Sequence, residues 1–267
     1  MARLPRLRLA QQRRFIDQGF LHVPQAIPRF QVDRALRAIN HSLGQGRPKE
    51  DLAKLNAQSW CPELGGDPVV TDLFNKSPAF EIAEDLIGVG RVQTVGGGQI
   101  PPRFPQALDV VEPKQPRGHI DGIGSGTNGI PCGEYHRGFT MLCVVLLSDL
   151  PEGDMGNFTV WPGTHELVAS RLREQGHGIL RHGIPDWDWK DVGIPHHPCT
   201  GQAGDIVFAH YLTWHTASPN LSPHIRYAAI FRVRHVDCGK NDLAALTDPW
   251  LEFEALQPLL PQAAPAA

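Results

Sequence analysis

Apolar residues recur every three or four positions in the first part of the chain, as in an amphipathic helix. The stretches with this spacing are residues 9–20 ("LAQQRRFIDQGF"), 29–44 and 77–88. In the third stretch Ser77 is suited to cap a helix, with Pro78 in its first turn. We therefore predict three helices, with a short strand at "FLHVP" after the first of them.

From about residue 91 the pattern changes to short runs rich in β-branched and aromatic residues, separated by Gly and Pro. The runs are residues 91–100, 138–150, 157–163, 205–216 and 225–236. Short strands separated by turn residues are typical of an antiparallel sandwich or barrel. A helical stretch at 163–176 interrupts them, and the last residues, 256–267, are expected to fray.

We find no internal repeat and no Ser/Gly linker that would divide the chain. The prediction is one domain over residues 1–267. It has a mainly helical part at 1–90, a β-rich core at 91–238 and a C-terminal tail at 239–267. The longest apolar run, "MLCVVLL", is expected to be a buried strand, because it is far too short to span a bilayer.

Charge and cysteine content exclude some classes of protein. The net charge of −3 gives no nucleic-acid footprint, and we expect no membrane partner. Five cysteines without a CxxC pair indicate free thiols in a reducing compartment. Because no apolar signal-peptide core follows the basic N-terminus, we expect a cytoplasmic protein.

The segment "PRGHIDGIGSGTNG" carries the candidate chemistry. In a strand, His119 and Asp121 would point to the same side. Joined by a further imidazole, they would make the two-histidine, one-carboxylate triad of non-haem Fe(II), which leaves positions open for a cosubstrate and dioxygen. The HxD pattern is weak alone, since His235 and Asp237 repeat it, but no histidine follows that second pair.

Three later histidines could complete the triad, namely His210, His215 and His224. His215 stands where a predicted strand ends, and Arg226 follows on the expected returning strand. A guanidinium there could hold the far carboxylate of 2-oxoglutarate by two parallel hydrogen bonds. We therefore favour His215, and interpret His210 as a packed core residue.

Four segments in order resemble the phytanoyl-CoA dioxygenase family of Fe(II)/2-oxoglutarate-dependent oxygenases. They are "FIDQGFLHVPQAIP", "GHIDG", "GNFTVWPGTH" and "GDIVFAHYLTWHTASPNLSPHIRYAAIFRV". The resemblance covers most of the chain. It implies an α+β fold, in which a double-stranded β-helix (a jelly-roll, cupin-like sandwich) carries N-terminal helices packed on one face.

The same resemblance implies roles for individual residues. His119, Asp121 and His215 would ligate the iron, and Arg226 would bind the 2-oxoglutarate C5 carboxylate. Gln99 stands where some relatives use a side-chain amide on the cosubstrate. One position departs from the family, because many relatives have Ser two residues after the second histidine and this chain has Ala217.

The implied activity is that of a dioxygenase, an oxidoreductase that uses Fe(II), 2-oxoglutarate and O2. It would oxidise an unactivated C–H bond of a small molecule, such as a natural-product intermediate, and release succinate and CO2. Hydroxylation is the default outcome, and desaturation or cyclisation would need the same triad. Two segments, 122–138 and 182–198 (with Trp187 and Trp189), are candidates for contact with the substrate.

Two other functions remain open. The chain could be a catalytically silent jelly-roll that binds a metal or ligand, although an intact triad with its arginine disfavours this. A cupin-type metal enzyme without 2-oxoglutarate would have an HxH motif with a nearby Glu, and the sequence has no HxH. In "WPGTH", Trp161 is expected in the core, Thr164 as a helix cap, and His165 as a solvated or capping residue.

Overall fold

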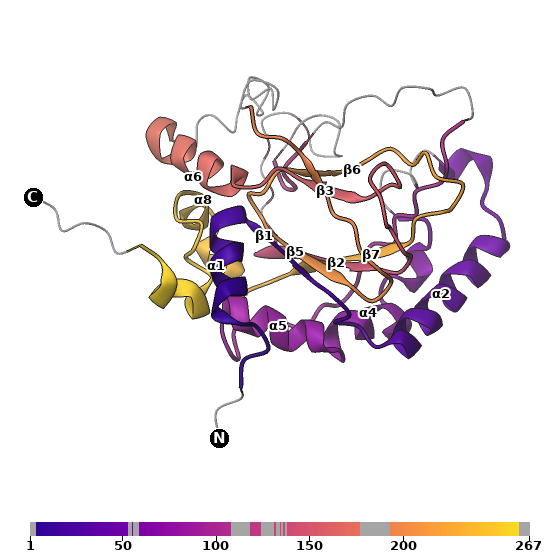
Figure 1. The fold of residues 1–267 in the computed structure, drawn as a ribbon, viewed down its shortest axis with the longest axis horizontal. Coiled ribbons are helices and arrows are strands. Elements are labelled where there is room, and N and C mark those ends of the chain that lie inside the picture. Colours follow the sequence, from indigo (N-terminus) through magenta and orange to yellow (C-terminus); the bar gives the residue numbers. More distant parts are fainter. Residues whose placement is uncertain are drawn as a thin grey trace, which may run out of the picture.

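The computed structural model describes residues 4–52, 55, 59–107, 118–123, 131, 134, 136, 138–176 and 193–261. Two antiparallel sheets lie face to face (Figure 1). The four-stranded sheet has the order β1 (Phe20–Val23), β5 (Ile206–His210), β2 (Met141–Leu146), β7 (Ala228–Val233). The three-stranded sheet has the order β4 (His197–Pro198), β3 (Phe158–Val160), β6 (His215–Ala217).

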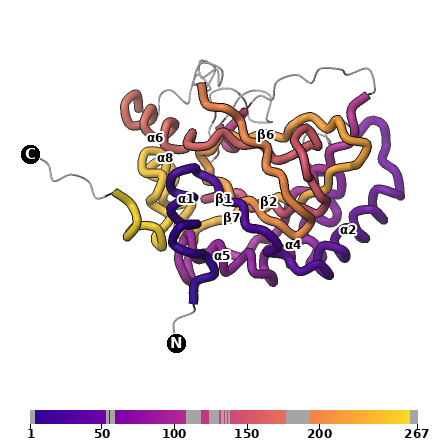
Figure 2. Tube along the Cα trace, viewed as in Figure 1, coloured from indigo at the N-terminus to yellow at the C-terminus, as the bar shows by residue number. Residues whose placement is uncertain are grey.

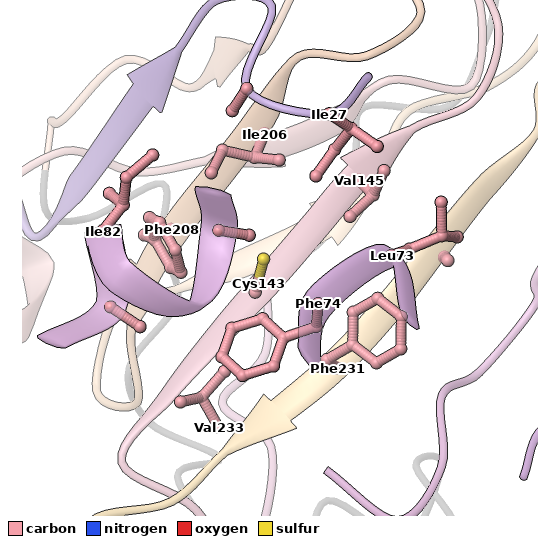
Figure 3. Packing of buried hydrophobic residues seen from close by; sticks show 14 of the residues in the cluster. Ile27, Leu73, Phe74, Ile82, Cys143, Val145, Ile206, Phe208, Phe231 and Val233 are labelled. Atoms are coloured by element: carbon pink, nitrogen blue, oxygen red, sulfur yellow. The ribbon is translucent and has the colours of Figure 1, made fainter. Parts of the chain in front are cut away.

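Both faces of the four-stranded sheet are buried, which explains the uninterrupted apolar run at β2. Side chains alternate along a strand, so Cys143 and Val145 point to one face and Leu142 and Val144 to the other. The first face packs against α2 (Arg29–Gly44), α4 (Pro68–Asn75) and α5 (Pro78–Ile87). Figure 3 shows this layer of the core. The second face meets the three-stranded sheet.

The predicted helices begin and end close to the residues that the sequence indicates. α1 (Leu9–Gln18) ends at Gly19, whose φ of +71° is the left-handed conformation that glycine adopts readily. α5 begins after Ser77, whose hydroxyl accepts from the Ala79 N–H at 3.1 Å. α4 was not predicted, because eight residues give too few turns for a clear period.

The C-terminal part packs on the core, contrary to the fraying expected from residue 256. Helix α6 (Thr164–Gln175) interrupts the strands, and α7 (Cys238–Asn241), α8 (Ala244–Thr247) and the 3-10 helix η4 (Glu254–Leu259) follow the last strand. Leu256 is fully buried. The Phe253 ring lies 5.5 Å from that of Phe15 in α1, so the described end of the chain is held beside the first helix (Figure 2).

The prediction of a regular strand at residues 91–100 is wrong. Only isolated bridges pair this segment with β7 and its continuation, through Val92 and Gln99. Between them lies "GGG", and a Cβ on Gly98 would come within 2.5 Å of the Phe231 ring. Glycines weaken a strand, and they allow the backbone to approach a side chain closely. In this segment they let the backbone pack against the Phe231 ring.

The antiparallel sandwich with helices on one face confirms the predicted α+β jelly-roll class. Two further 3-10 turns lie in the N-terminal part, η1 (Lys49–Asp51) and η2 (Pro62–Leu64). None of the helices in the described ranges is both long and apolar enough to cross a bilayer. That residues 1–267 form one domain stays a prediction.

Candidate metal centre

A β-bridge sets the two histidines of the candidate site side by side. His119 N–H donates to the His215 carbonyl at 3.0 Å, and His215 N–H donates back at 3.0 Å. The imidazole centroids are 4.6 Å apart. Behind the bridge, Gly118 packs on Trp161 so closely that a Cβ would lie 2.9 Å from the indole. Glycine at this position therefore lets the His119 strand reach β6.

Asp121 points to the same place from the turn that follows. Gly122 has a φ of +87°, which turns the chain immediately after the carboxylate. Asp121 Oδ1 lies 3.3 Å from His119 Nε2 and 3.7 Å from His215 Nε2. Within the described ranges, these three side chains form the one cluster whose ligand atoms could share an ion, all within 4.8 Å of one another.

The spacing and the donor set fit a first-row divalent metal. Ligand atoms about 2.1 Å from an ion and at right angles to each other lie roughly 3 Å apart, close to the separations seen here. Two imidazoles and one carboxylate are the facial set of non-haem Fe(II) enzymes. The predicted residues are thus brought together, and their role as ligands is taken up below as a proposal.

The ring of His215 is fixed in the orientation that a ligand needs. Its Nδ1 lies 2.9 Å from the Thr213 carbonyl, which can only accept, so Nδ1 carries the hydrogen. Nε2 then keeps a free lone pair, and it is Nε2 that faces Asp121. The ring is 5.4 Å from that of Phe158 and the residue is 5% exposed, so packing holds it as well.

The protonation states also suit a metal. Burial alone would raise the pKa of Asp121, but hydrogen bonds from His119 and His215, with the positive charge of Arg232, bring it well below its usual range. Burial lowers the pKa of His119 in spite of the nearby carboxylate. At neutral pH the site therefore offers an ionised carboxylate and a neutral His119 imidazole, the forms that bind metal ions.

Arg232 is a site residue to which the sequence assigned no role in its own right. Its Nη2 lies 2.7 Å from Asp121 Oδ2, and its Nη1 donates to Gln99 Oε1 at 2.9 Å. The one sequence feature that could have indicated it is the alternation of side chains along a strand. Arg232 lies six residues after Arg226, so the two side chains are expected on the same, inner face of the sheet.

Arg226 is buried deeper in the sandwich, at 4% exposure. It donates to the carbonyls of Gly156 at 2.7 Å and Pro101 at 3.0 Å. Gly156 pairs with Pro219, so the guanidinium reaches the sheet of His215 beyond the end of β6. Burial, and then the charge of Arg103, lower its pKa to about 9. Among the described residues no carboxylate pairs with Arg226.

Gln99 lies at the edge of the candidate centre. Its backbone bridges to Ile230 on β7, and its side-chain carbonyl accepts from Arg232. A pocket of about 460 Å³ opens at this point. It is lined by residues 93–99 with Gly65, Ile230, Arg232 and Arg234. The pocket and the candidate centre therefore share Gln99 and Arg232.

Three further histidines of the described part of the chain have structural contacts. His210 is buried, as predicted, with Nε2 donating to the Pro249 carbonyl at 2.7 Å. The expectation of a solvated His165 is wrong, because the ring is fully buried and donates to the Ile16 carbonyl at 2.9 Å. In the second HxD pair, His235 Nδ1 accepts from the Asp237 backbone N–H at 3.0 Å, and its Nε2 faces the Glu254 carboxylate at 3.2 Å.

Trp161 is fully buried, as expected. Thr164 is not the helix cap, because Gly163 takes that position with a φ of +78°. The Thr164 hydroxyl instead donates to the Trp161 carbonyl at 2.7 Å and accepts from Trp214 N–H at 3.0 Å. It thus joins the start of α6 to the segment before His215. Most of the two candidate substrate segments, 122–138 and 182–198, lies outside the described residues.

The family described as Phytanoyl-CoA dioxygenase (PhyH) matches residues 134–228, which include His215 and Arg226. This match confirms the predicted oxidoreductase class. No curated protein matches the chain.

Solved structures show the same fold. The 2-oxoglutarate-dependent carbocyclase SnoK from nogalamycin biosynthesis is 21% identical, with a TM-score of 0.56 over 89% of this chain and 91% of SnoK. The epimerase SnoN, from the same biosynthesis, is 18% identical with a TM-score of 0.51, over 85% and 81%. HygX from Streptomyces hygroscopicus, with nickel and 2-oxoglutarate bound, is 17% identical with a TM-score of 0.53, over 86% and 88%.

The match and the common fold agree with the motifs from which the family was predicted. The chain resembles the phytanoyl-CoA dioxygenase-like family of Fe(II)/2-oxoglutarate-dependent oxygenases.

Proposed function

We propose that this protein is an Fe(II)/2-oxoglutarate-dependent dioxygenase that oxidises an unactivated C–H bond of a small molecule. The observation that carries the proposal is the convergence of His119, Asp121 and His215 on one point, with ligand atoms within 4.8 Å of one another. The resemblance to the family and the shared fold support it. HygX, one of the similar structures, has been solved with iron and with 2-oxoglutarate.

In this proposal, His119, Asp121 and His215 hold the iron, which supplies the oxygen-activating chemistry when 2-oxoglutarate and dioxygen are present. The protein contributes orientation. Thr213 fixes the His215 tautomer through its carbonyl. The sandwich buries the His215 ring and so limits the access of water to it.

Arg226 is proposed to bind the far carboxylate of 2-oxoglutarate. Its guanidinium is oriented by two carbonyls, which leaves other N–H groups for a ligand. In the part of the chain that the structure describes, this buried charge has no carboxylate partner, which is costly, and an anionic ligand would relieve that cost. The Ser218 hydroxyl, next to the position of the missing family serine, shares its one hydrogen between Asn157 Oδ1 at 3.4 Å and the Pro219 carbonyl at 3.3 Å. It is therefore not available to take the part of that serine beside Arg226.

We propose that the substrate enters beside Gln99 and Arg232, where the pocket of about 460 Å³ meets the metal site. That volume suits a small molecule. The similar structures include HygX with hygromycin B bound. The charged residues lining the pocket are Arg232 and Arg234, so an acidic or hydroxyl-rich molecule fits better than a cation.

The test is anaerobic titration of the Fe(II)-loaded protein with 2-oxoglutarate, followed by the weak visible charge-transfer band of the chelate. We expect the band in the wild type and in Arg234→Gln, and a much weaker one in Arg226→Ala at the same 2-oxoglutarate concentration. Iron binding without any band would contradict the function and favour a silent jelly-roll that binds a metal.

A further inference from the structure

Arg232 joins the candidate metal centre to the edge of the substrate pocket. Its two terminal nitrogens have different partners, Asp121 Oδ2 at 2.7 Å and Gln99 Oε1 at 2.9 Å. The guanidinium lies 5.7 Å above the Phe139 ring. The fork is therefore held by a carboxylate, an amide and an aromatic face, although the side chain is 38% exposed.

The two oxygens of Asp121 are used differently. Oδ1 faces both imidazoles, at 3.3 Å from His119 Nε2 and 3.7 Å from His215 Nε2. Oδ2 faces Arg232. A carboxylate whose outer oxygen is held by a cation presents the other oxygen alone, so it binds a metal through one atom and leaves more of the coordination sphere open.

We propose that Arg232 is a positioning residue, which holds the outer oxygen of Asp121 so that Asp121 ligates the metal through Oδ1 only. The same side chain orients Gln99. A guanidinium only donates, so the Gln99 carbonyl oxygen must face it and the amide N–H groups point elsewhere. Arg232 thus fixes the orientation of the proposed metal ligand Asp121 and of the Gln99 amide at the edge of the pocket.

Arg226, just before β7, and Arg232, within β7, have different roles in the proposed site. Both project from the inner side of the strand, since Ala228 and Ile230 between them belong to the inner core. Arg226 is bound by backbone carbonyls, whereas Arg232 is bound by the Asp121 carboxylate. No carboxylate of the described residues pairs with Arg226, which suits it to the cosubstrate, while Arg232 acts through Asp121.

The inference rests on the metal role of the triad in the proposed function, and not on 2-oxoglutarate. The first experiment measures Co(II) affinity, in the absence of 2-oxoglutarate, for wild type, Arg232→Met and Arg232→Lys. We expect Arg232→Met to bind Co(II) about 10- to 100-fold more weakly, the usual effect of losing a hydrogen-bond partner of a metal ligand. Arg232→Lys, which keeps the charge but not the fork, is expected to fall between them.

The matched control is Arg234→Met, two residues further along the chain, whose guanidinium donates to the Gly138 carbonyl and contacts no triad residue. It is expected to bind Co(II) as the wild type does. The visible absorption bands of bound Co(II) report ligand geometry, and we expect them to change in Arg232→Met and to stay unchanged in Arg234→Met. Wild-type affinity and bands in Arg232→Met would overturn the proposal.

A double-mutant cycle separates positioning from general damage. In an Asp121→Asn background, Arg232→Met is expected to cause no further loss of Co(II) affinity, because the partner charge is already absent. An undiminished loss in that background would overturn the proposal. If Co(II) binding and the cycle behave as expected but 2-oxoglutarate gives no charge-transfer band, the positioning role stands and the proposed function fails.

Discussion

The backbones of His119 and His215 hydrogen-bond to each other in both directions, at 3.0 Å each. The two imidazoles are therefore placed by a β-bridge between segments far apart in the sequence. Any change that moves one strand of the bridge moves a proposed metal ligand. The packing behind the bridge is thus part of the site.

Gly118→Ala is expected to disturb both stability and metal binding. The added Cβ would lie 2.9 Å from the ring of the fully buried Trp161, which cannot move aside. Overpacking of this kind costs about 1–3 kcal/mol of unfolding free energy. Thermal unfolding and Co(II) affinity are the measurements.

Gly239→Ala is the matched control, because its added Cβ would meet no atom within 4 Å in the structure. It is expected to leave both quantities almost unchanged. Equal effects of the two substitutions would contradict the role given to Gly118.

Helices α1, α2, α5 and α6 and most strands could be predicted from the sequence because their signals are local. Gly19 and Ser77 mark helix ends by their own conformational and hydrogen-bonding properties. The prediction of a strand at 91–100 was wrong because this segment packs against the Phe231 ring, which is far along the chain, and does not form a regular ladder of hydrogen bonds. His165 was misplaced for the same reason: a sequence does not show that Ile16 lies beside it.

The site could be predicted in part. His119, Asp121 and His215 come together because the HxD spacing and the downstream histidine are features of the sequence itself. The sequence offered Arg232 and Arg234 only as alternatives to Arg226, and the contact of Arg232 with Asp121 was not predicted, because nothing local distinguishes Arg232 from Arg234. Only the register of β7 against the Asp121 turn decides which of the two reaches the carboxylate.

Arg226→Ala is expected to weaken 2-oxoglutarate binding by about 2–5 kcal/mol, the cost of losing one member of a buried charged pair. Metal affinity is expected to change little. Isothermal titration of the Co(II)-loaded protein with 2-oxoglutarate measures the effect. Unchanged 2-oxoglutarate affinity in a variant that still folds would remove Arg226 from the cosubstrate site.

Ala217→Ser restores the hydroxyl that many relatives carry. Ala217 pairs with Phe158 in the β6–β3 ladder and is partly exposed, so a hydroxyl fits without repacking. We expect 2-oxoglutarate affinity to rise by about 0.5–1.5 kcal/mol, one additional hydrogen bond. The same titration checks this. A loss of affinity would place the carboxylate elsewhere than beside β6.

Cys143 and Cys199 are expected to resist alkylation in the folded protein. Burial raises the pKa of Cys143, and raises that of Cys199 to about 12, so neither forms thiolate at pH 8. Peptide mapping after brief iodoacetamide treatment should find both unmodified, and modified after denaturation. Fast labelling of either in the native protein would contradict the burial.

The same shift makes stability depend on pH. The unfolded thiol of Cys199 ionises near pH 9, whereas the folded one stays protonated to about pH 12. Its contribution is therefore complete below about pH 9 and is lost as the pH rises toward 12. Removing the thiol, as in Cys199→Ala, should flatten the fall in unfolding free energy over that range. An identical fall in both proteins would contradict this.

The proposed function depends on His119, Asp121 and His215 holding one metal ion. The most direct test is Fe(II) stoichiometry, measured anaerobically on the wild type and on His119→Ala, His215→Ala and His210→Ala. We predict one Fe(II) per chain in the wild type and in His210→Ala, whose ring binds the Pro249 carbonyl. The other two variants should retain almost none, and stoichiometric iron in either would contradict the assignment.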